Sequence, residues 1–122
     1  MPDAEHLSTG QWAEDQAAGH LEQHGLRLIE RNFRCRFGEL DLIMADADVL
    51  VFVEVRFRRS ERFGGALESV TRAKQRRLLA AARAYLARRG GGEPRCRFDV
   101  VSVTKRNYRP DFIWLRDAFG QD

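Results

Sequence analysis

Two carboxylates occupy positions where β-strands normally carry apolar side chains. Asp41 stands between two leucines, and Glu54 stands between two valines. An unpaired carboxylate in an apolar core costs several kcal/mol. Each of these residues therefore requires a cation, and either a metal ion or a basic side chain meets that requirement.

Two neighbouring segments predict the strands that carry these acids. Residues 37–45 and 49–57 combine alternation with β-branched and aromatic side chains, which is typical of strands. The acidic segment 46–48 between them suits a tight turn. Because residues 49–53 are apolar on both faces, we expect this strand to be central in its sheet, with helices over both sides.

The geometry of such a hairpin favours a shared cation. Alternation places Asp41 on the same face as Glu39, and Glu54 on the same face as Arg56. An even number of unpaired turn residues brings Asp41 and Glu54 to one face, and a four-residue loop places them directly opposite. Carboxylates about 5 Å apart repel each other unless a cation lies between them. Mg²⁺ or Mn²⁺ fits this need and can activate water for phosphodiester hydrolysis.

Basic residues follow the acidic part of the chain. The net charge is only +3. Residues 1–54 contain four bases and eleven acids, a charge of −7, whereas residues 55–97 contain thirteen bases and three acids, a charge of +10. This order is typical of a polyanion-binding surface with an embedded metal site, although a solvated basic helix has the same composition. The candidate nucleic-acid-binding residues are Arg58, Arg59, Arg62, Arg72, Lys74 and Arg76.

The rest of the chain predicts two helices and three more strands. Residues 9–24 repeat apolar side chains at helical spacing before a glycine, and a second helix, capped by Ser69 or Thr71, ends at three glycines after Arg89. The dipeptide Arg109-Pro110 is expected to break the chain. The further strands are expected at 26–33, 97–103 and 112–115.

This order of elements, α-β-β-β-α-β-β, predicts the α/β class with a mixed central sheet flanked by helices. The length of 122 residues predicts one domain over residues 1–122. Residues 1–8, which are polar and acidic, are expected to form a flexible N-terminus.

Composition argues against several classes of protein. No run of 18 apolar residues occurs, and the N-terminal residues are not basic and then hydrophobic, so neither a transmembrane segment nor a signal peptide is expected. Cys35 and Cys96 lie far apart without a CxxC pair, which argues against a disulfide-rich secreted scaffold and against a zinc site. We expect a cytoplasmic protein with reduced thiols and no membrane partner.

The sequence resembles a known family at these residues. The motif Gly38-Glu39-Leu40-Asp41-Leu42-Ile43, followed by Phe52-Val53-Glu54-Val55 and by Arg56 where a lysine is usual, is similar to the bacterial YraN family. That family belongs to the restriction-endonuclease-like superfamily with the PD-(D/E)XK signature and is similar to Holliday-junction resolvases. The resemblance covers nearly the whole chain, from Trp12-Ala13-Glu14 to Ala118-Phe119.

The resemblance implies a restriction-endonuclease-like fold and a set of site residues. Asp41 and Glu54 correspond to the two metal-binding acids, the carbonyl of Val55 to a third ligand, and Glu14 to an acid beside the metal. Arg56 occupies the position of the motif lysine. Arginine cannot exchange a proton near neutral pH, although it can stabilise charge on a phosphoryl transition state. Two helix residues, Lys74 and Gln75, are candidates for the vacant lysine role and for the edge of the site.

The implied function is a metal-dependent endonuclease that uses Mg²⁺ or Mn²⁺ on nucleic acid, with structured or branched DNA as the expected partner. Related resolvases act as dimers, so a homodimer is an open option. One alternative is a nucleic-acid-binding protein that has lost turnover with the lysine. Another is a structural domain in which Asp41 and Glu54 pair with Arg56 or Arg58. Glu14 on a solvated helix edge, and Lys74 extending from the core edge, are the corresponding structural interpretations.

Overall fold

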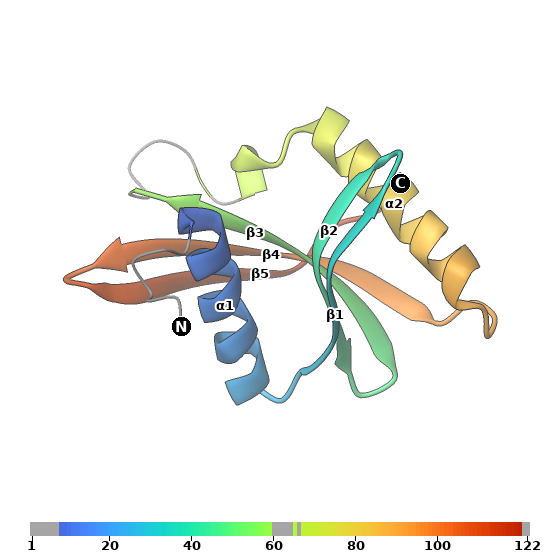
Figure 1. The fold of residues 1–122 in the computed structure, drawn as a ribbon, viewed down its shortest axis with the longest axis horizontal. Helices are drawn as coiled ribbons and strands as arrows, with labels where there is room; N and C mark the ends of the chain where they lie inside the picture. Colours follow the sequence, from blue (N-terminus) through green and yellow to red (C-terminus); the bar gives the residue numbers. More distant parts are fainter. Residues whose placement is uncertain (1–7, 60–64, 66, 121–122) are drawn as a thin grey trace.

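The computed structural model describes residues 8–59, 65 and 67–120, without the side chain of Leu67. Its elements follow the predicted order of two helices and five strands, with one short 3-10 helix before the second helix (Figure 1). The elements are α1 (Thr9–Gln23), β1 (Arg27–Cys35), β2 (Gly38–Asp46), β3 (Val49–Arg58), η2 (Leu67–Ser69), α2 (Arg72–Arg89), β4 (Arg95–Arg106) and β5 (Arg109–Phe119).

The five strands form one mixed sheet in the order β1-β2-β3-β4-β5. The pair β3–β4 is parallel and the other three pairs are antiparallel, because α2 is the crossover that connects β3 to β4. The prediction of an α/β fold with a mixed sheet is confirmed. Strand β3 is central, as its apolar run indicated.

Each helix covers one face of the sheet. Because strand side chains alternate, neighbouring residues of β3 enter different clusters. The α1-side cluster contains Ala13, Ala17, Ala18, Leu21, Leu26, Leu42, Met44, Val51, Val53, Val101 and Val103. The α2-side cluster contains Phe33, Leu40, Ile43, Leu50, Phe52, Val70, Leu78, Ala81, Ala82, Tyr85, Phe98 and Val100.

The start of α1 removes Ser8 from the flexible segment predicted over residues 1–8. Ser8 is the N-cap: its hydroxyl accepts a hydrogen bond from the backbone N–H of Gln11, and the Gln11 side chain accepts one from the backbone N–H of Ser8. This reciprocal capping box satisfies two backbone donors, so Ser8 is part of the folded structure. Residues 1–7 lie outside the described residues.

The last strand also differs from its prediction. The chain does not break at Arg109-Pro110, and β5 is much longer than 112–115. The turn instead falls at Asn107 and Tyr108, which both have left-handed backbone conformations. An edge strand tolerates proline because one of its sides makes no ladder hydrogen bonds, and β5 is at the edge of the sheet. No helix in the described part of the chain is long and apolar enough to cross a membrane.

Candidate metal and nucleic-acid site

Strand β2 changes face at Asp41. Leu42 and Met44 belong to the α1-side cluster, whereas Leu40 belongs to the α2-side cluster, although alternate strand residues normally share a face. The β2–β3 ladder runs from the pair Asp46–Val49 to the pair Leu42–Val53, and beyond it the two strands part (Figure 1). Asp41 therefore lies at the fork between β2 and β3.

At this fork the side chain of Asp41, rather than a backbone carbonyl of β2, accepts a hydrogen bond from β3. Its Oδ2 accepts a hydrogen bond of 2.9 Å from the backbone N–H of Val55 in β3. The turn between the strands contains two residues, 47 and 48, so the condition of an even number of unpaired residues is met. Continuing the observed register places Asp41 opposite Glu54.

Strand β1 changes face beside Asp41. Arg31 pairs with Asp15 of α1, whereas Phe33 contacts Tyr85 of α2. Asn32 between them has a left-handed φ of 52°, which asparagine adopts more readily than most residues. This conformation accompanies the reversal of the strand.

Asn32 holds two acids next to Asp41. Its side-chain amide donates hydrogen bonds of 3.0 Å to Oε1 of Glu14, from α1, and to Oε1 of Glu39, from β2. One carboxylate oxygen from each of Glu14, Glu39 and Asp41 lies within 4.8 Å of the others. We call these three residues, with Glu54, the acid cluster.

Glu54 approaches the fork from the α2 side. Only 4% of its surface is exposed. Its Oε2 lies 3.5 Å from Nη1 of Arg56 and 3.7 Å from Nζ of Lys74. Among the described residues, its Oε1 is the buried side-chain polar atom that has no hydrogen-bond partner. One oxygen of Glu54 therefore faces two cations, whereas the other has no basic partner among the described residues and can accept a hydrogen bond from the protonated Asp41 carboxyl group or bind a cation.

Two acids of the cluster, Asp41 and Glu14, have raised pKa values. Burial, and then the charge of Glu54, raises the pKa of Asp41 to about 7, against the opposing effect of the Val55 hydrogen bond. Burial also raises the pKa of Glu14, and the charges of Asp41 and Glu39 act in the same direction, although the Asn32 hydrogen bond opposes them. A divalent cation would relieve this repulsion.

We expect the stability of the metal-free protein to fall as the pH rises from about 4 to about 7. The folded state keeps a proton on Asp41 up to pH 7, whereas the unfolded chain releases it near its ordinary pKa of 3.8. The folded state binds more protons in this window, so the free energy of unfolding decreases by up to about 1.4 kcal/mol per pH unit. Urea denaturation in EDTA between pH 4 and 8 measures this slope, and Asp41→Asn should have a shallower one. An equal slope in the variant would contradict the assignment.

Comparison with known proteins places the chain in a family. The profile described as "Uncharacterised protein family UPF0102" matches residues 13–103. The chain belongs to the UPF0102 family. It is 52% identical to a UPF0102 protein of Nitrosococcus oceani over 98% of this chain and 97% of the relative. It is 53% identical to a UPF0102 protein of Nitrosomonas europaea, over 92% of this chain and 93% of the relative. It is 50% identical to a UPF0102 protein of Stutzerimonas stutzeri, over 95% of this chain and 98% of the relative.

In this UPF0102 chain the predicted acids Glu14 and Asp41 lie together with Glu39, and Glu54 is close enough to Asp41 for its charge to act on that residue. Arg56 lies beside Glu54. The sequence prediction did not include Glu39, although strand alternation had already placed it on the face of Asp41. It also missed Asn32, because nothing local signals that β1 reverses there. Val55 contacts the cluster through its N–H, so a metal-binding Val55 carbonyl stays a prediction.

The alternative of carboxylate–arginine pairing holds for only one of the two acids. Glu54 has Arg56 and Lys74 as partners. Within the described residues Asp41 has no ion-pair partner, and the Arg58 guanidinium donates to the carbonyl of Gly65. Arginine pairing therefore does not compensate the whole acid cluster.

The predicted nucleic-acid-binding residues lie on two elements of the UPF0102 chain. Arg72 and Arg76 are exposed on α2, which also carries Lys74, and Arg59 is exposed after the end of β3, where Arg58 is half-buried. Arg62 lies outside the described residues. Gln75 donates to the carbonyl of Val70, so its amide supports the start of α2 rather than the acid cluster.

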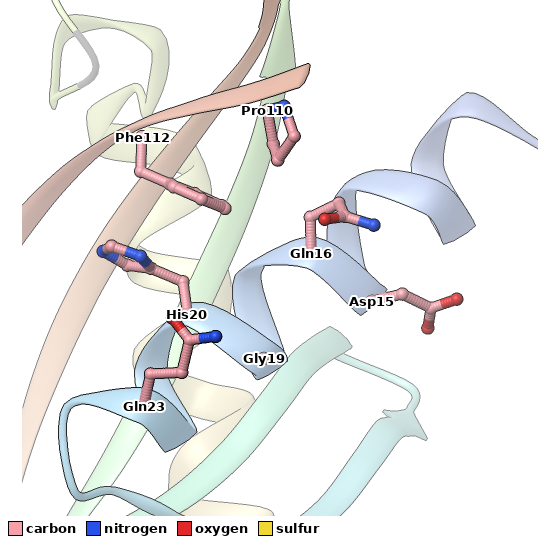
Figure 2. Close-up of a pocket in the computed structure, with 7 residues that line it drawn as sticks. All are labelled: Asp15, Gln16, Gly19, His20, Gln23, Pro110 and Phe112. Atoms are coloured by element: carbon pink, nitrogen blue, oxygen red, sulfur yellow. The ribbon is translucent and has the colours of Figure 1, made fainter. Parts of the chain in front are cut away.

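A separate pocket of about 240 Å³ lies between α1 and the start of β5 (Figure 2). The ring of His20 stacks on Phe112 at 4.1 Å, and burial, followed by the charge of His24, lowers the pKa of His20. None of the acid cluster lines this pocket, so we do not assign the candidate site to it. Its lining residues are Asp15, Gln16, Gly19, His20, Gln23, Pro110 and Phe112.

Proposed function

We propose that this UPF0102 protein is a metal-dependent endonuclease that hydrolyses phosphodiester bonds in nucleic acid, with structured or branched DNA as its substrate class. The observation that supports this proposal is the acid cluster itself, which gathers four carboxylates and the partnerless Oε1 of Glu54 at the fork of β2 and β3. The proposal includes membership of the restriction-endonuclease-like PD-(D/E)XK superfamily, through the resemblance to YraN proteins and Holliday-junction resolvases.

The donor set suits Mg²⁺ or Mn²⁺, which prefer carboxylate oxygens. Asp41 is the residue common to both halves of the cluster, since it neighbours Glu54 as well as Glu14 and Glu39. The proposed ligands are Asp41 and Glu54, with Glu14 and Glu39 beside them and the Val55 carbonyl as a further oxygen. Such an ion, when bound, lowers the pKa of a water molecule and neutralises charge on a phosphoryl group.

In this proposal Lys74 and Arg56 each take one of the two roles of the motif lysine. Both lie against the same Glu54 oxygen. A lysine amine can orient water and exchange a proton, whereas an arginine keeps its charge and presents a planar set of donors to phosphate. Lys74 is therefore assigned the amine role and Arg56 the stabilisation of developing negative charge.

The basic residues on either side hold the nucleic acid without reading bases. Arg58 is the last residue of β3 and Arg59 follows it, and Arg72 and Arg76 lie on α2. Contacts of guanidinium groups with phosphates position a backbone but carry no sequence information. Binding should therefore weaken steeply with salt and depend on the shape of the nucleic acid.

Cleavage of labelled single-stranded, duplex and four-way-junction DNA in Mn²⁺ tests the proposal. We expect Lys74→Ala to lower the cleavage rate about 100-fold, since general acid–base groups contribute on the order of 10² to 10⁴. Arg56→Lys should retain cleavage within about tenfold. Arg83→Ala, an exposed substitution on the same helix, is the matched control and should leave the rate unchanged. Full activity of Lys74→Ala would remove the amine role, and inactivity of the wild type on every substrate would count against the endonuclease.

A second candidate function is favoured by Arg56 in place of the lysine. It is a nucleic-acid-binding protein that keeps the fold and basic surface but does not cleave. In that case the wild type binds DNA in a salt-dependent way without cutting it, and Arg56→Lys gains cleavage. If neither protein binds DNA at low salt, both nucleic-acid proposals fail.

Location and assembly complete the proposal. Cys35 and Cys96 are both free, which suits a reducing compartment such as the cytoplasm. A homodimer, as in related resolvases, would place two acid clusters on one branched substrate. Sedimentation equilibrium with and without junction DNA measures this assembly.

A further inference from the structure

The tip of the β4–β5 hairpin carries an aromatic side chain in an unfavourable backbone conformation. Asn107 has a φ of 51° and Tyr108 a φ of 65°, and the flanking pair is Arg106–Arg109. Two-residue hairpin turns with both φ angles positive favour Asn-Gly, so tyrosine occupies a position that glycine suits better. Strained residues of this kind concentrate at functional sites.

Burial does not compensate for this strain. Tyr108 is 92% exposed, against about 40% for the other exposed large hydrophobic residues of the described chain, Ile29, Phe37 and Ile113. Its ring therefore stands in solvent, where a bulky apolar group contributes nothing to the core.

The surroundings of Tyr108 are basic. Lys105, Arg106 and Arg109 are all exposed. Within the described residues, Asp111 is the acid that pairs with one of these three basic residues, and its Oδ2 lies 3.7 Å from Nη2 of Arg106. Cations that alternate with an exposed aromatic ring form the usual combination for binding nucleic acid, because phosphates take the charges and a base stacks on the ring.

The tip lies at the same end of the sheet as the basic exit of β3. In the parallel pair, Glu54 is opposite Val100, and Arg58 is opposite Thr104. Figure 1 shows the hairpin projecting past the end of β3 and past the start of α1. Tyr108 follows Val100 by eight residues, which is about 25 Å at a rise of about 3.3 Å per residue.

A second contact connects the hairpin to the site. The Lys105 ammonium lies 5.3 Å from the ring centre of Trp12, in the first turn of α1, which also carries Glu14. A duplex that crosses the acid cluster and runs along β3 would reach the tip about seven base pairs away, given a rise of about 3.4 Å per pair.

We propose that the β4–β5 tip is a second nucleic-acid contact, in which Tyr108 stacks on an unpaired base while Lys105, Arg106 and Arg109 hold the adjacent phosphates. This inference rests on the proposed nucleic-acid function and deepens it. It specifies a substrate with an unpaired or unstacked base, as at a bulge, a duplex end or a junction. This base would lie about seven base pairs from the phosphodiester bond that is cleaved at the acid cluster.

Fluorescence anisotropy with matched DNA tests this contact. The probes are a fully paired duplex and the same duplex with a one-nucleotide bulge, in EDTA so that no cleavage occurs. Tyr108→Ala should weaken binding to the bulged duplex about tenfold or more, as expected for loss of one stacked base, and change binding to the paired duplex less than twofold. Tyr108→Trp should retain the preference for the bulge.

Phe37→Ala is the matched control. Phe37 is an exposed aromatic residue with Arg36 over its ring, and it lies at the tip of the β1–β2 hairpin, far from the β4–β5 tip (Figure 1). This substitution should leave both affinities unchanged. Tyr108→Gly, which removes the ring and relieves the left-handed strain, should raise the melting temperature and lose the preference for the bulge.

The outcomes separate this inference from the proposed function. If the wild type binds neither DNA, the nucleic-acid function itself fails. If the wild type binds both but Tyr108→Ala matches Phe37→Ala, only the stacking contact fails. If Tyr108→Ala weakens binding to both duplexes equally, the tip is a general contact for the DNA backbone and the stacking assignment is wrong.

Discussion

Asp41→Asn is expected to stabilise the metal-free protein and to abolish metal-dependent cleavage. At pH 8 the wild-type carboxylate is ionised in a site where burial and Glu54 raise its pKa to about 7, so the folded state carries unrelieved repulsion. The amide removes this charge while its oxygen can still accept the hydrogen bond from the Val55 N–H. We expect the unfolding free energy in EDTA to rise by roughly 1–3 kcal/mol, or about 5–10 °C in melting temperature.

The same substitution should remove the effects of the metal. Wild-type protein should melt at a higher temperature in Mn²⁺, because a ligand that binds only the folded state stabilises it. The variant should show no such shift, and its cleavage rate should fall on the order of 10³-fold. Differential scanning calorimetry in EDTA and in Mn²⁺ measures both effects on stability.

Asp48→Asn is the matched control, since Asp48 is exposed in the β2–β3 turn and lies outside the acid cluster. It should leave the melting temperature and the Mn²⁺ shift unchanged. A lower melting temperature for Asp41→Asn in EDTA, or an intact Mn²⁺ shift, would show that Asp41 is a structural acid.

Asp99→Ala is expected to destabilise the folded protein strongly. Asp99 is fully buried in β4. Its carboxylate accepts hydrogen bonds from the Arg97 guanidinium through both oxygens, from Nε1 of Trp114, and from the backbone N–H of Asp117. Arg97 in turn donates to Asp46 at the end of β2. One carboxylate thus joins the strands β2, β4 and β5.

Alanine would remove the acceptor of four hydrogen bonds, which are donated by Arg97, Trp114 and Asp117. Removing one partner of a buried ion pair costs about 3–5 kcal/mol, which corresponds to roughly 10–20 °C in melting temperature for a domain of this size. Asp99 is outside the acid cluster, so the Mn²⁺ shift should persist in whatever fraction remains folded.

Asp111→Ala provides the comparison for Asp99→Ala. Asp111 is also an aspartate paired with an arginine, but its side chain is 57% exposed and its partner lies 3.7 Å away. Exposed ion pairs contribute about 0–1 kcal/mol, so this variant should melt within a few degrees of the wild type. Equal effects of the two alanines, measured by urea denaturation, would contradict the structural role of Asp99.

The hydrogen-bond network of Asp99 accounts for charged residues of β4 that lie outside the acid cluster. The segment Arg97-Phe98-Asp99-Val100 lies within the part of the chain that the family resemblance covers, yet its charged residues contact one another, Asp46 and β5 rather than the acid cluster. Nothing local distinguishes Asp99 from Asp41, because both are acids within apolar strands. Only the neighbouring strands decide that the Asp99 carboxylate receives hydrogen bonds from several donors, whereas the Asp41 carboxylate receives one, from the N–H of Val55.

The sequence by itself determined the elements and one side of the site. Alternation and turn composition predicted the β2–β3 hairpin. Alternation also showed that a loop with an even number of residues would bring Asp41 and Glu54 to one face. Helical spacing and the glycine stop likewise predicted α2 almost to the residue. These patterns depend on neighbours within a few positions, which a sequence shows directly.

The tertiary structure alone decided the rest of the site. The reversal of β1 and β2 at Asn32 and Asp41 brings Glu14 and Glu39 to the fork, and the crossover through α2 carries Lys74 to Glu54. Face changes and crossovers depend on which cluster each strand end packs against, and that choice is made by the whole core rather than by local pattern. The sequence therefore showed how Asp41 and Glu54 could meet and named Lys74 as a candidate, whereas the contact of Lys74 with Glu54 and the contributions of Asn32 and Glu39 required the fold.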